Sequence, residues 1–217
     1  MEHSDVSTFF HEFGHLIHHL LGRSGKYVAV SGTNVEWDFV EAPSQLLEEW
    51  SQDPKVLATF AKHIETGKPI PAKMVQKMVK ASELGKGVDL QRQVYLANFS
   101  FYLHTADPKT LDLEAFTCKM YDEHSPFPRF EGDHLYANFG HLIDYSAIYY
   151  TYQWSLTIAK DLFTRFEQKG LMDEGVAAEY RAKVLEPGGT RRAGELVDDF
   201  LGRPRNLDAY KAWIERE

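Results

Sequence analysis

Apolar residues recur every three or four positions along most of this chain, the spacing that places them on one face of an α-helix. The first such run covers residues 6–21, with Ser4 or Asp5 as its cap and Gly22 as its stop. The same spacing predicts further helices at residues 38–50, 54–66, 72–82, 87–104, 112–122, 145–167, 173–186, 190–202 and from Leu207 onward.

Two stretches interrupt the helical pattern. Residues 27–32 are β-prone and end in a glycine, so we expect a small strand or an extended loop there. Residues 125–133 contain two prolines and a glycine, which indicate a loop. Because no internal repeat or low-complexity linker is visible, we expect one mainly α, multi-helix domain over residues 1–217, with at most a small β element near 27–32.

Composition and charge exclude several classes of protein. With 43% hydrophobic and 26% charged residues, the chain has the balance of a globular protein rather than a disordered one. Its formal charge is −8 and its basic residues form no long run, so we do not expect nucleic acid as a partner. The single cysteine, Cys118, excludes an internal disulfide and fits a reducing compartment.

No stretch approaches the roughly 18 consecutive apolar residues of a membrane span. Residues 1–5 are acidic where a signal peptide is basic. We therefore expect a cytoplasmic protein that does not contact a membrane.

The densest candidate chemistry lies in the first predicted helix, where His11 and His15 stand four residues apart with Glu12 between them. Residues four apart share a helix face, so both imidazoles can bind one ion while Glu12 reaches its edge. Gly14 costs about 0.5–1 kcal/mol relative to alanine in a helix interior, which indicates that another segment packs closely against the backbone there. This HExxH pattern is typical of zinc peptidases.

A catalytic zinc ion usually has three protein ligands and one open position, so a third ligand is needed. His18 shares the helix face, but it lies roughly 10 Å from His11 along the axis, too far for both to bind one ion. We expect His18 instead to stack above the site or to contact substrate. A carboxylate from the next helix can approach from the side, and the sequence itself leaves five candidates: Glu36, Asp38, Glu41, Glu48 and Glu49.

Three segments closely resemble the active-site core of the thimet oligopeptidase family of zinc metallopeptidases. They are residues 8–15 (TFFHEFGH), 31–36 (SGTNVE) and 38–45 (DFVEAPSQ). Further similarity extends the resemblance over nearly the whole chain, at residues 139–141, 145–154, 180–190 and 199–203. The resemblance implies a zincin-like catalytic domain with one Zn²⁺ per chain, acting as a metalloendopeptidase on short peptides.

By this resemblance, Glu41 joins His11 and His15 as the third zinc ligand. Glu12 is then the general base that takes a proton from the metal-activated water. The segment at residues 142–144 is one residue shorter than in the family and lacks the family's glycine pair.

The resemblance also gives roles to residues around the ligands. Asp38 and Gln45, about one turn to either side of Glu41, are candidates to hydrogen-bond the outer atoms of the ligands. The remaining assignments are Tyr145 and Tyr152 as catalytic hydrogen-bond donors, and His141 and Tyr149 as substrate-binding residues. Tyr145 and Tyr152 are two turns apart, so a helix over residues 145–167 would hold both on one face.

The family's enzymes are several hundred residues longer, and their N-terminal half forms the other wall of the peptide channel. We expect this chain to be a C-terminal fragment of such an enzyme, with that missing half and short peptides as partners. One alternative is a truncated zinc- or peptide-binding module without turnover. A second is a di-iron carboxylate bundle, in which Glu131 and His134 repeat the Glu-x-x-His spacing of Glu12 and His15.

Overall fold

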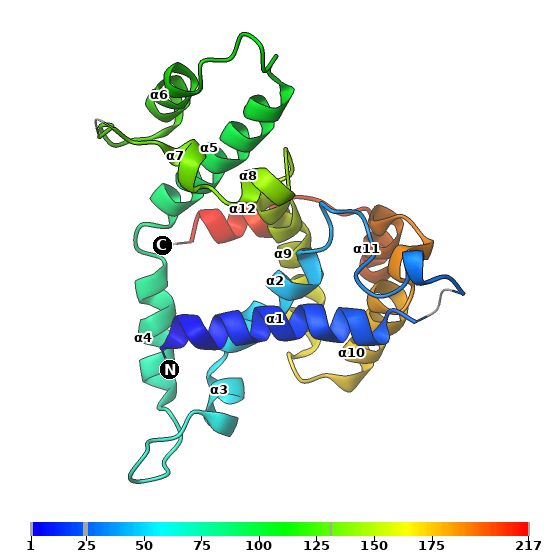
Figure 1. Cartoon of the computed structure of the whole chain (residues 1–217). Helices are drawn as coiled ribbons and strands as arrows, with labels where there is room; N and C mark the ends of the chain where they lie inside the picture. The colour runs from blue at the N-terminus through cyan, green and yellow to red at the C-terminus, as the bar shows by residue number, and fades with distance from the viewer. Residues whose placement is uncertain (1, 24–25, 131, 217) are drawn as a thin grey trace. The chain divides into compact units, whose positions relative to one another are not determined.

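The computed structural model describes residues 2–23, 26–130 and 132–216 (Figure 1). Within these ranges the chain forms helices and turns and no β-strand, so the predicted mainly α fold is confirmed. The chain divides into two compact units. Unit 2 is Gly85–Gln153, and unit 1 comprises the residues up to Leu84 together with those from Trp154 onward.

Unit 1 contains the first four helices and the C-terminal ones. The helices are α1 (His3–Leu21), α2 (Ala42–Glu48), α3 (Pro54–Phe60), α4 (Ala72–Ser82), all but the first residues of α9 (Thr151–Lys169), α10 (Glu174–Tyr180), α11 (Ala193–Leu201) and α12 (Asp208–Ile214). Short 3₁₀ turns occur at η1 (Val28–Val30), η2 (Glu49–Gln52) and η4 (Gly188–Thr190), and a π-helical turn, η3 (Arg181–Leu185), continues α10. The core includes the buried side chains of Phe39, Leu46, Leu162, Phe166, Val197 and Phe200.

Unit 2 is built on two longer helices, α5 (Lys86–Thr105) and α6 (Leu113–His124). Two short helices follow, α7 (Leu135–Asn138) and α8 (His141–Asp144). Its core is a small cluster of aromatic and aliphatic side chains that includes Tyr95, Phe99 and Met120. Asp112 caps α6 by accepting hydrogen bonds from two backbone amides of its first turn.

The crossing of α1 and α2 fixes the part of unit 1 that matters for function. A Cβ atom added to Gly14 would lie 2.6 Å from Ser44 Cα and 3.0 Å from the Pro43 carbonyl oxygen, so the two backbones touch at this point. The close approach inferred from Gly14 is therefore confirmed. Pro43 lies in the first turn of α2, where its missing N–H is not needed.

Several predicted helix boundaries are wrong for identifiable reasons. Helix α1 begins earlier than predicted, at His3, because Glu2 is its N-cap and Asp5 accepts the Glu2 amide in a capping box. Residues 38–41 form a turn before α2 instead of its first turn. In the segment at residues 27–32, residues 28–30 form the 3₁₀ turn η1 instead of a strand, and Tyr27 and Ser31 on either side of it have extended backbones.

Two other helices are shorter than predicted. Helix α3 ends at Phe60 because residues 61–70 fold back, with Lys62 paired to Pro69. Helix α9 begins at Thr151 instead of residue 145: Ser146 has a left-handed backbone (φ 54°) that a right-handed helix cannot include, and residues 147–150 after it are also non-helical.

No helix in the described ranges combines the length and apolar character needed to cross a lipid bilayer.

Candidate metal centre

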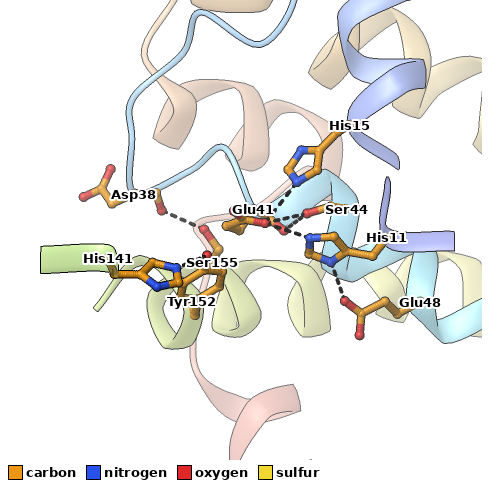
Figure 2. Close-up of polar contacts among 9 residues, drawn as sticks. All are labelled: His11, His15, Asp38, Glu41, Ser44, Glu48, His141, Tyr152 and Ser155. Carbon is orange, nitrogen blue, oxygen red and sulfur yellow. Dashed lines mark hydrogen bonds and ion pairs between the residues drawn. The ribbon is translucent and has the colours of Figure 1, made fainter. Parts of the chain in front are cut away.

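Two histidines and one glutamate of unit 1 converge on a single point (Figure 2). His11 Nε2 and His15 Nε2 each lie 3.2 Å from Glu41 Oε2. The two imidazole rings are nearly perpendicular, with centroids 4.9 Å apart. One ligand-type atom from each of the three residues lies within 4.8 Å of the others, so the three form a candidate metal centre.

Local structure explains why these side chains meet. Residues 11 and 15 share one face of α1, and α2 begins directly beside them because Gly14 admits its backbone. Glu41 is the residue before α2, and its carboxylate turns back toward α1. Ser44 Oγ donates to Glu41 Oε2 at 3.0 Å, and the Glu41 carbonyl oxygen is 2.9 Å away, so one hydroxyl holds the carboxylate against its own helix start.

The structure separates the five carboxylate candidates. Glu36 accepts a hydrogen bond from the Ala193 amide at 3.0 Å, and Glu49 forms an ion pair with Lys160. Asp38 is held through its carbonyl oxygen, which accepts from Ser155 Oγ at 2.9 Å. Among the candidates in the described ranges, Glu41 is the one that meets both histidines.

Glu48 has a different place at the site: its Oε1 atom lies 2.6 Å from His11 Nδ1. The carboxylates of Glu41 and Glu48 therefore flank the two nitrogens of one imidazole. Sequence reasoning proposed Asp38 and Gln45 for this supporting role and missed Glu48 and Ser44. Residues 41, 44 and 48 are three and four apart, a spacing that places them on one side of a helix, but the spacing does not show that this side meets His11. Gln45 lies half-buried in α2, one turn after Glu41.

The electrostatics of the group favour a cation. Burial by itself raises the pKa of the Glu41 carboxyl, but hydrogen bonds from His11 and His15 outweigh it and hold that pKa well below its usual range. Hydrogen bonds to Glu41 and Glu48 raise the pKa of His11 to about 10, against the lowering effect of burial. Two carboxylates thus make the space beside the imidazoles strongly attractive to positive charge.

The other polar residues of α1 have different surroundings. Glu12 is exposed, beside His11 in the chain. His18 is completely buried and packs edge-on against Phe39, with ring centroids 6.4 Å apart. Burial lowers the pKa of His18 to about 4. The prediction that His18 contacts substrate is wrong, because its ring belongs to the interior of unit 1.

A second cluster of predicted residues lies within unit 2. His141 Nε2 is 3.1 Å from the Tyr152 hydroxyl (Figure 2), and the rings of Tyr145 and Tyr149 lie 5.5 and 5.1 Å from the His141 ring. Tyr149 donates a hydrogen bond to Gln93 Oε1 at 3.1 Å, and burial raises the pKa of the Tyr149 phenol. The structure therefore brings all four residues together, with Gln93 as an additional member.

Tyr145 is about half exposed and precedes α9. The prediction that one helix carries both Tyr145 and Tyr152 is wrong for this reason.

The di-iron alternative needs Glu131 and His134 on one long helix. Glu131 lies outside the described residues. His134 directly precedes the four-residue helix α7, and its Nδ1 atom is 3.2 Å from the Tyr136 hydroxyl. A long helix carrying this pair, which a di-iron bundle requires, is not found in residues 132–138.

The helical fold thus carries a candidate metal centre whose donor set, two imidazoles and one carboxylate, also occurs in catalytic zinc sites of metallopeptidases. The sequence model of peptidase family M3 matches residues 1–215, and the chain belongs to that family.

Curated relatives include oligopeptidase A of Escherichia coli, 36% identical over 95% of this chain and 31% of its own length. Mitochondrial intermediate peptidase of Arabidopsis thaliana is 33% identical over 94% of this chain and 29% of its own length. Saccharolysin of Saccharomyces cerevisiae is 32% identical over 97% of this chain and 30% of its own length. The chain thus spans about a third of the length of the curated relatives it matches.

Proposed function

We propose that this chain is the zinc-binding catalytic part of a cytoplasmic metalloendopeptidase that hydrolyses short peptides. The observation that carries the proposal is the convergence of His11, His15 and Glu41 in a chain that belongs to peptidase family M3. The names of its relatives describe peptidases and oligopeptidases, which supports a peptide substrate. Both units together would form one catalytic domain over residues 1–217.

The donor set and its spacing support one Zn²⁺ ion per chain. Zinc binds imidazole nitrogens and carboxylate oxygens at about 2.0–2.2 Å, so two ligands at the tetrahedral angle are about 3.4 Å apart. The distances of 3.2 Å from Glu41 Oε2 to each Nε2 atom are close to that value. When bound, zinc acts as a Lewis acid that lowers the pKa of a water molecule and polarises the scissile carbonyl.

The residues around this site have separate roles in the proposal. Glu12 accepts a proton from the attacking water and passes it to the leaving nitrogen. Glu48 accepts the Nδ1 proton of His11, which fixes the tautomer that presents Nε2 to the ion. Ser44 orients the Glu41 carboxylate.

The cluster in unit 2 supplies the residues proposed to act on the peptide. Tyr152 or Tyr145 donates a hydrogen bond to the carbonyl oxygen as negative charge develops there. His141 and Tyr149 bind the peptide backbone or side chains. Asp38 and Gln45 remain candidates for supporting the ligands.

One alternative function keeps the residues without turnover. The chain spans about a third of its relatives' length, so a zinc- or peptide-binding module is the second candidate. Zinc content measured by atomic emission, together with cleavage of a quenched fluorescent peptide with and without a chelator, tests both candidates. One zinc per chain with chelator-sensitive cleavage supports the peptidase, whereas zinc without cleavage supports the module. Absence of stoichiometric zinc contradicts the peptidase and the zinc-binding module.

Replacing Glu12 separates catalysis from metal binding. We expect Glu12→Gln to retain one zinc per chain and the same helical content while reducing kcat by about 10²–10⁴, because it removes the proton acceptor and leaves the ligands. The matched control is Glu65→Gln, which changes an exposed glutamate 53 positions after Glu12 in the sequence; this variant should cleave normally. Undiminished cleavage by Glu12→Gln would show that another group moves the proton.

A further inference from the structure

Helix α1 carries a second apolar face that unit 1 leaves open. The buried residues of α1 are Gly14 and His18, which face α2 and the core. Four large apolar side chains on the opposite side are 42–60% exposed: Phe9, Phe13, Leu16 and Leu20. Their spacing of four, three and four residues makes them one continuous row, here called the outer stripe.

This arrangement is unusual for a helix at a protein surface. Such helices present one apolar face to the core and charged residues on the other side, whereas helices that are apolar nearly all round are buried. Two polar residues of α1, Glu12 and His19, are exposed near the proposed metal ligands. They occupy only a narrow sector of the helix surface, between those ligands and the outer stripe. The rings of Phe9 and Phe13 stack on each other at 5.9 Å, so this row is an ordered surface rather than scattered side chains.

An apolar groove continues the outer stripe on its other side. Ile17 and Leu21, the next residues around α1, line a groove of about 590 Å³ within unit 1. Its other walls include Leu46, Leu47, Trp50, Phe166 and Leu171. Trp50 Nε1 donates a hydrogen bond to the Leu171 carbonyl oxygen at 3.0 Å. This bond joins two walls of the groove that are far apart in the sequence. A row of exposed apolar residues beside an apolar groove marks an interaction surface.

We propose that the outer stripe and this groove are the docking surface for the polypeptide that makes up the other two thirds of the longer family members. The chain covers only 29–31% of the relatives, so a large amount of protein is available to cover the surface. The matching segment would present leucine- or phenylalanine-type side chains along about 16 Å, the length from Phe9 to Leu20 on a helix.

A second copy of this chain is the weaker candidate for the occupant. The four side chains of the outer stripe expose on the order of 400 Å² in total. A stable protein interface buries about 800 Å² on each partner, so a stripe-to-stripe dimer would be too small. A covalently continuous polypeptide does not lose translational freedom when it docks, so it needs less buried area.

The position of the outer stripe links it to the metal centre. Leu16 and Glu12 are four residues apart on α1 and neighbours on its surface. A segment docked on the outer stripe therefore borders Glu12 and excludes bulk water from one side of it. This inference depends on the longer family members and not on zinc, so it can fail while the proposed metal function stands.

The direct test measures whether the outer stripe becomes covered in a full-length protein. The chain is placed in E. coli oligopeptidase A in exchange for the region that aligns with it, in a Cys118→Ser background. Leu20→Cys is then labelled with a thiol reagent in the chimera and in the isolated chain. We expect labelling at least about tenfold slower in the chimera, while Ile64→Cys, at a residue 97% exposed and outside the surface, is labelled equally in both.

A second measurement uses separate polypeptides. The part of E. coli oligopeptidase A outside the aligned region is mixed with this chain, and association is followed by sedimentation equilibrium. We expect a 1:1 complex, because the added polypeptide can cover the groove as well as the outer stripe. Leu16→Lys with Leu20→Lys should weaken this complex at least about 30-fold, as for central contacts of an interface, and Ile64→Lys should leave it intact. Circular dichroism and zinc content check that the variants are folded.

Three results would overturn the proposal. Equal labelling of Leu20→Cys in the chimera and the isolated chain would show that the outer stripe stays open. A complex unaffected by the double lysine variant would place the contact elsewhere. Self-association of the chain that the double variant abolishes, without binding to the added polypeptide, would assign the surface to a second copy.

Discussion

At the scale of single residues, the metal centre depends on which carboxylate reaches the two imidazoles. The HExxH spacing predicted His11 and His15, because two residues four apart on one helix need no other element to meet. The third ligand comes from another element, and five carboxylates in that segment fit the sequence equally well. Resemblance to a family pointed to Glu41, and the structure brings Glu41 to both rings while Glu36 and Glu49 bind elsewhere.

The role of Glu48 as a partner of His11 could not be predicted from spacing either, because Glu48 also lies on a different element from His11. Its contact with His11 depends on how closely α2 passes α1, which the absence of a side chain at Gly14 determines. The sequence shows which residues neighbour one another within one helix, but not which residues of α1 and α2 meet across the helix pair.

We expect Glu48→Gln to weaken zinc binding about 10- to 100-fold, because the His11 ring loses the carboxylate that orients it and raises its basicity. Competition with a chromophoric zinc chelator measures the affinity directly, apart from activity. Glu123→Gln, which removes an exposed carboxylate paired with Lys119 in α6, is the matched control. An unchanged zinc affinity for Glu48→Gln would mean that the short contact has no part in holding the ligand.

His18 should make stability depend on pH in a defined window. Burial lowers its pKa to about 4 in the folded chain, against an ordinary value near 6.5. As pH falls below about 6.5, the unfolded chain binds a proton that the folded chain does not, so stability declines by up to about 1.4 kcal/mol per pH unit. The accumulated loss reaches about 3 kcal/mol near pH 4.

His18→Leu, of similar volume, should flatten the stability curve between pH 6.5 and 4.5 relative to the parent. Urea unfolding in the presence of a chelator gives the free energy of unfolding of both proteins at each pH. Above pH 7 the two curves should differ by a constant, because His18 is neutral in both states there. Curves that run parallel down to pH 4.5 would exclude His18 as the titrating group.

For the secondary-structure elements, the apolar periodicity predicted which helices exist better than it predicted where they begin and end. The helix predicted at residues 72–82 matches α4 at both ends, because its apolar positions recur regularly between Pro71 and Glu83. The helix predicted at 54–66 ends at Phe60 because the chain reverses, and a local pattern does not register a pairing such as Lys62 with Pro69. The start of α9 was misplaced because a left-handed serine has no sequence signature comparable to glycine or proline.

Gly14 tests the helix crossing that positions the metal ligands. Alanine is intrinsically better than glycine in a helix by about 1 kcal/mol, but a Cβ at residue 14 would lie 2.6 Å from Ser44 Cα. We expect Gly14→Ala to lower the free energy of unfolding by about 1–3 kcal/mol, because α2 must move away from α1. The same displacement should weaken zinc binding, since Glu41 moves with α2.

The matched control is Gly87→Ala in α5, where nothing lies within 4 Å of the added Cβ. It should leave stability unchanged or raise it by up to about 1 kcal/mol. Urea unfolding of both variants measures the difference. If Gly14→Ala is as stable as the parent and retains its zinc affinity, the close contact at this crossing does not determine the site.

At the scale of the whole molecule, the proposed catalytic residues are divided between the two units. The metal ligands, Glu12 and Glu48 belong to unit 1, whereas His141, Tyr149 and Tyr152 belong to unit 2. The sequence could predict both groups because the family resemblance covers both segments. It could not predict the division into units, because that depends on which helices share a core, and the two cores use similar aromatic and aliphatic residues.

Zinc should stabilise this chain by mass action, because its proposed ligands come together only in the folded state. A ligand at 1,000 times its dissociation constant adds about 4 kcal/mol to folding, which corresponds to a rise in Tm of roughly 8–16 °C for a chain of this size. Scanning calorimetry with zinc, and again after chelation, measures the shift.

Magnesium should not replace zinc, since Mg²⁺ prefers oxygen ligands and retains its waters. Glu41→Gln should lose most of the response, because the ion then has two protein ligands and no carboxylate. A zinc-induced shift that Glu41→Gln retains in full would place the bound ion away from His11 and His15.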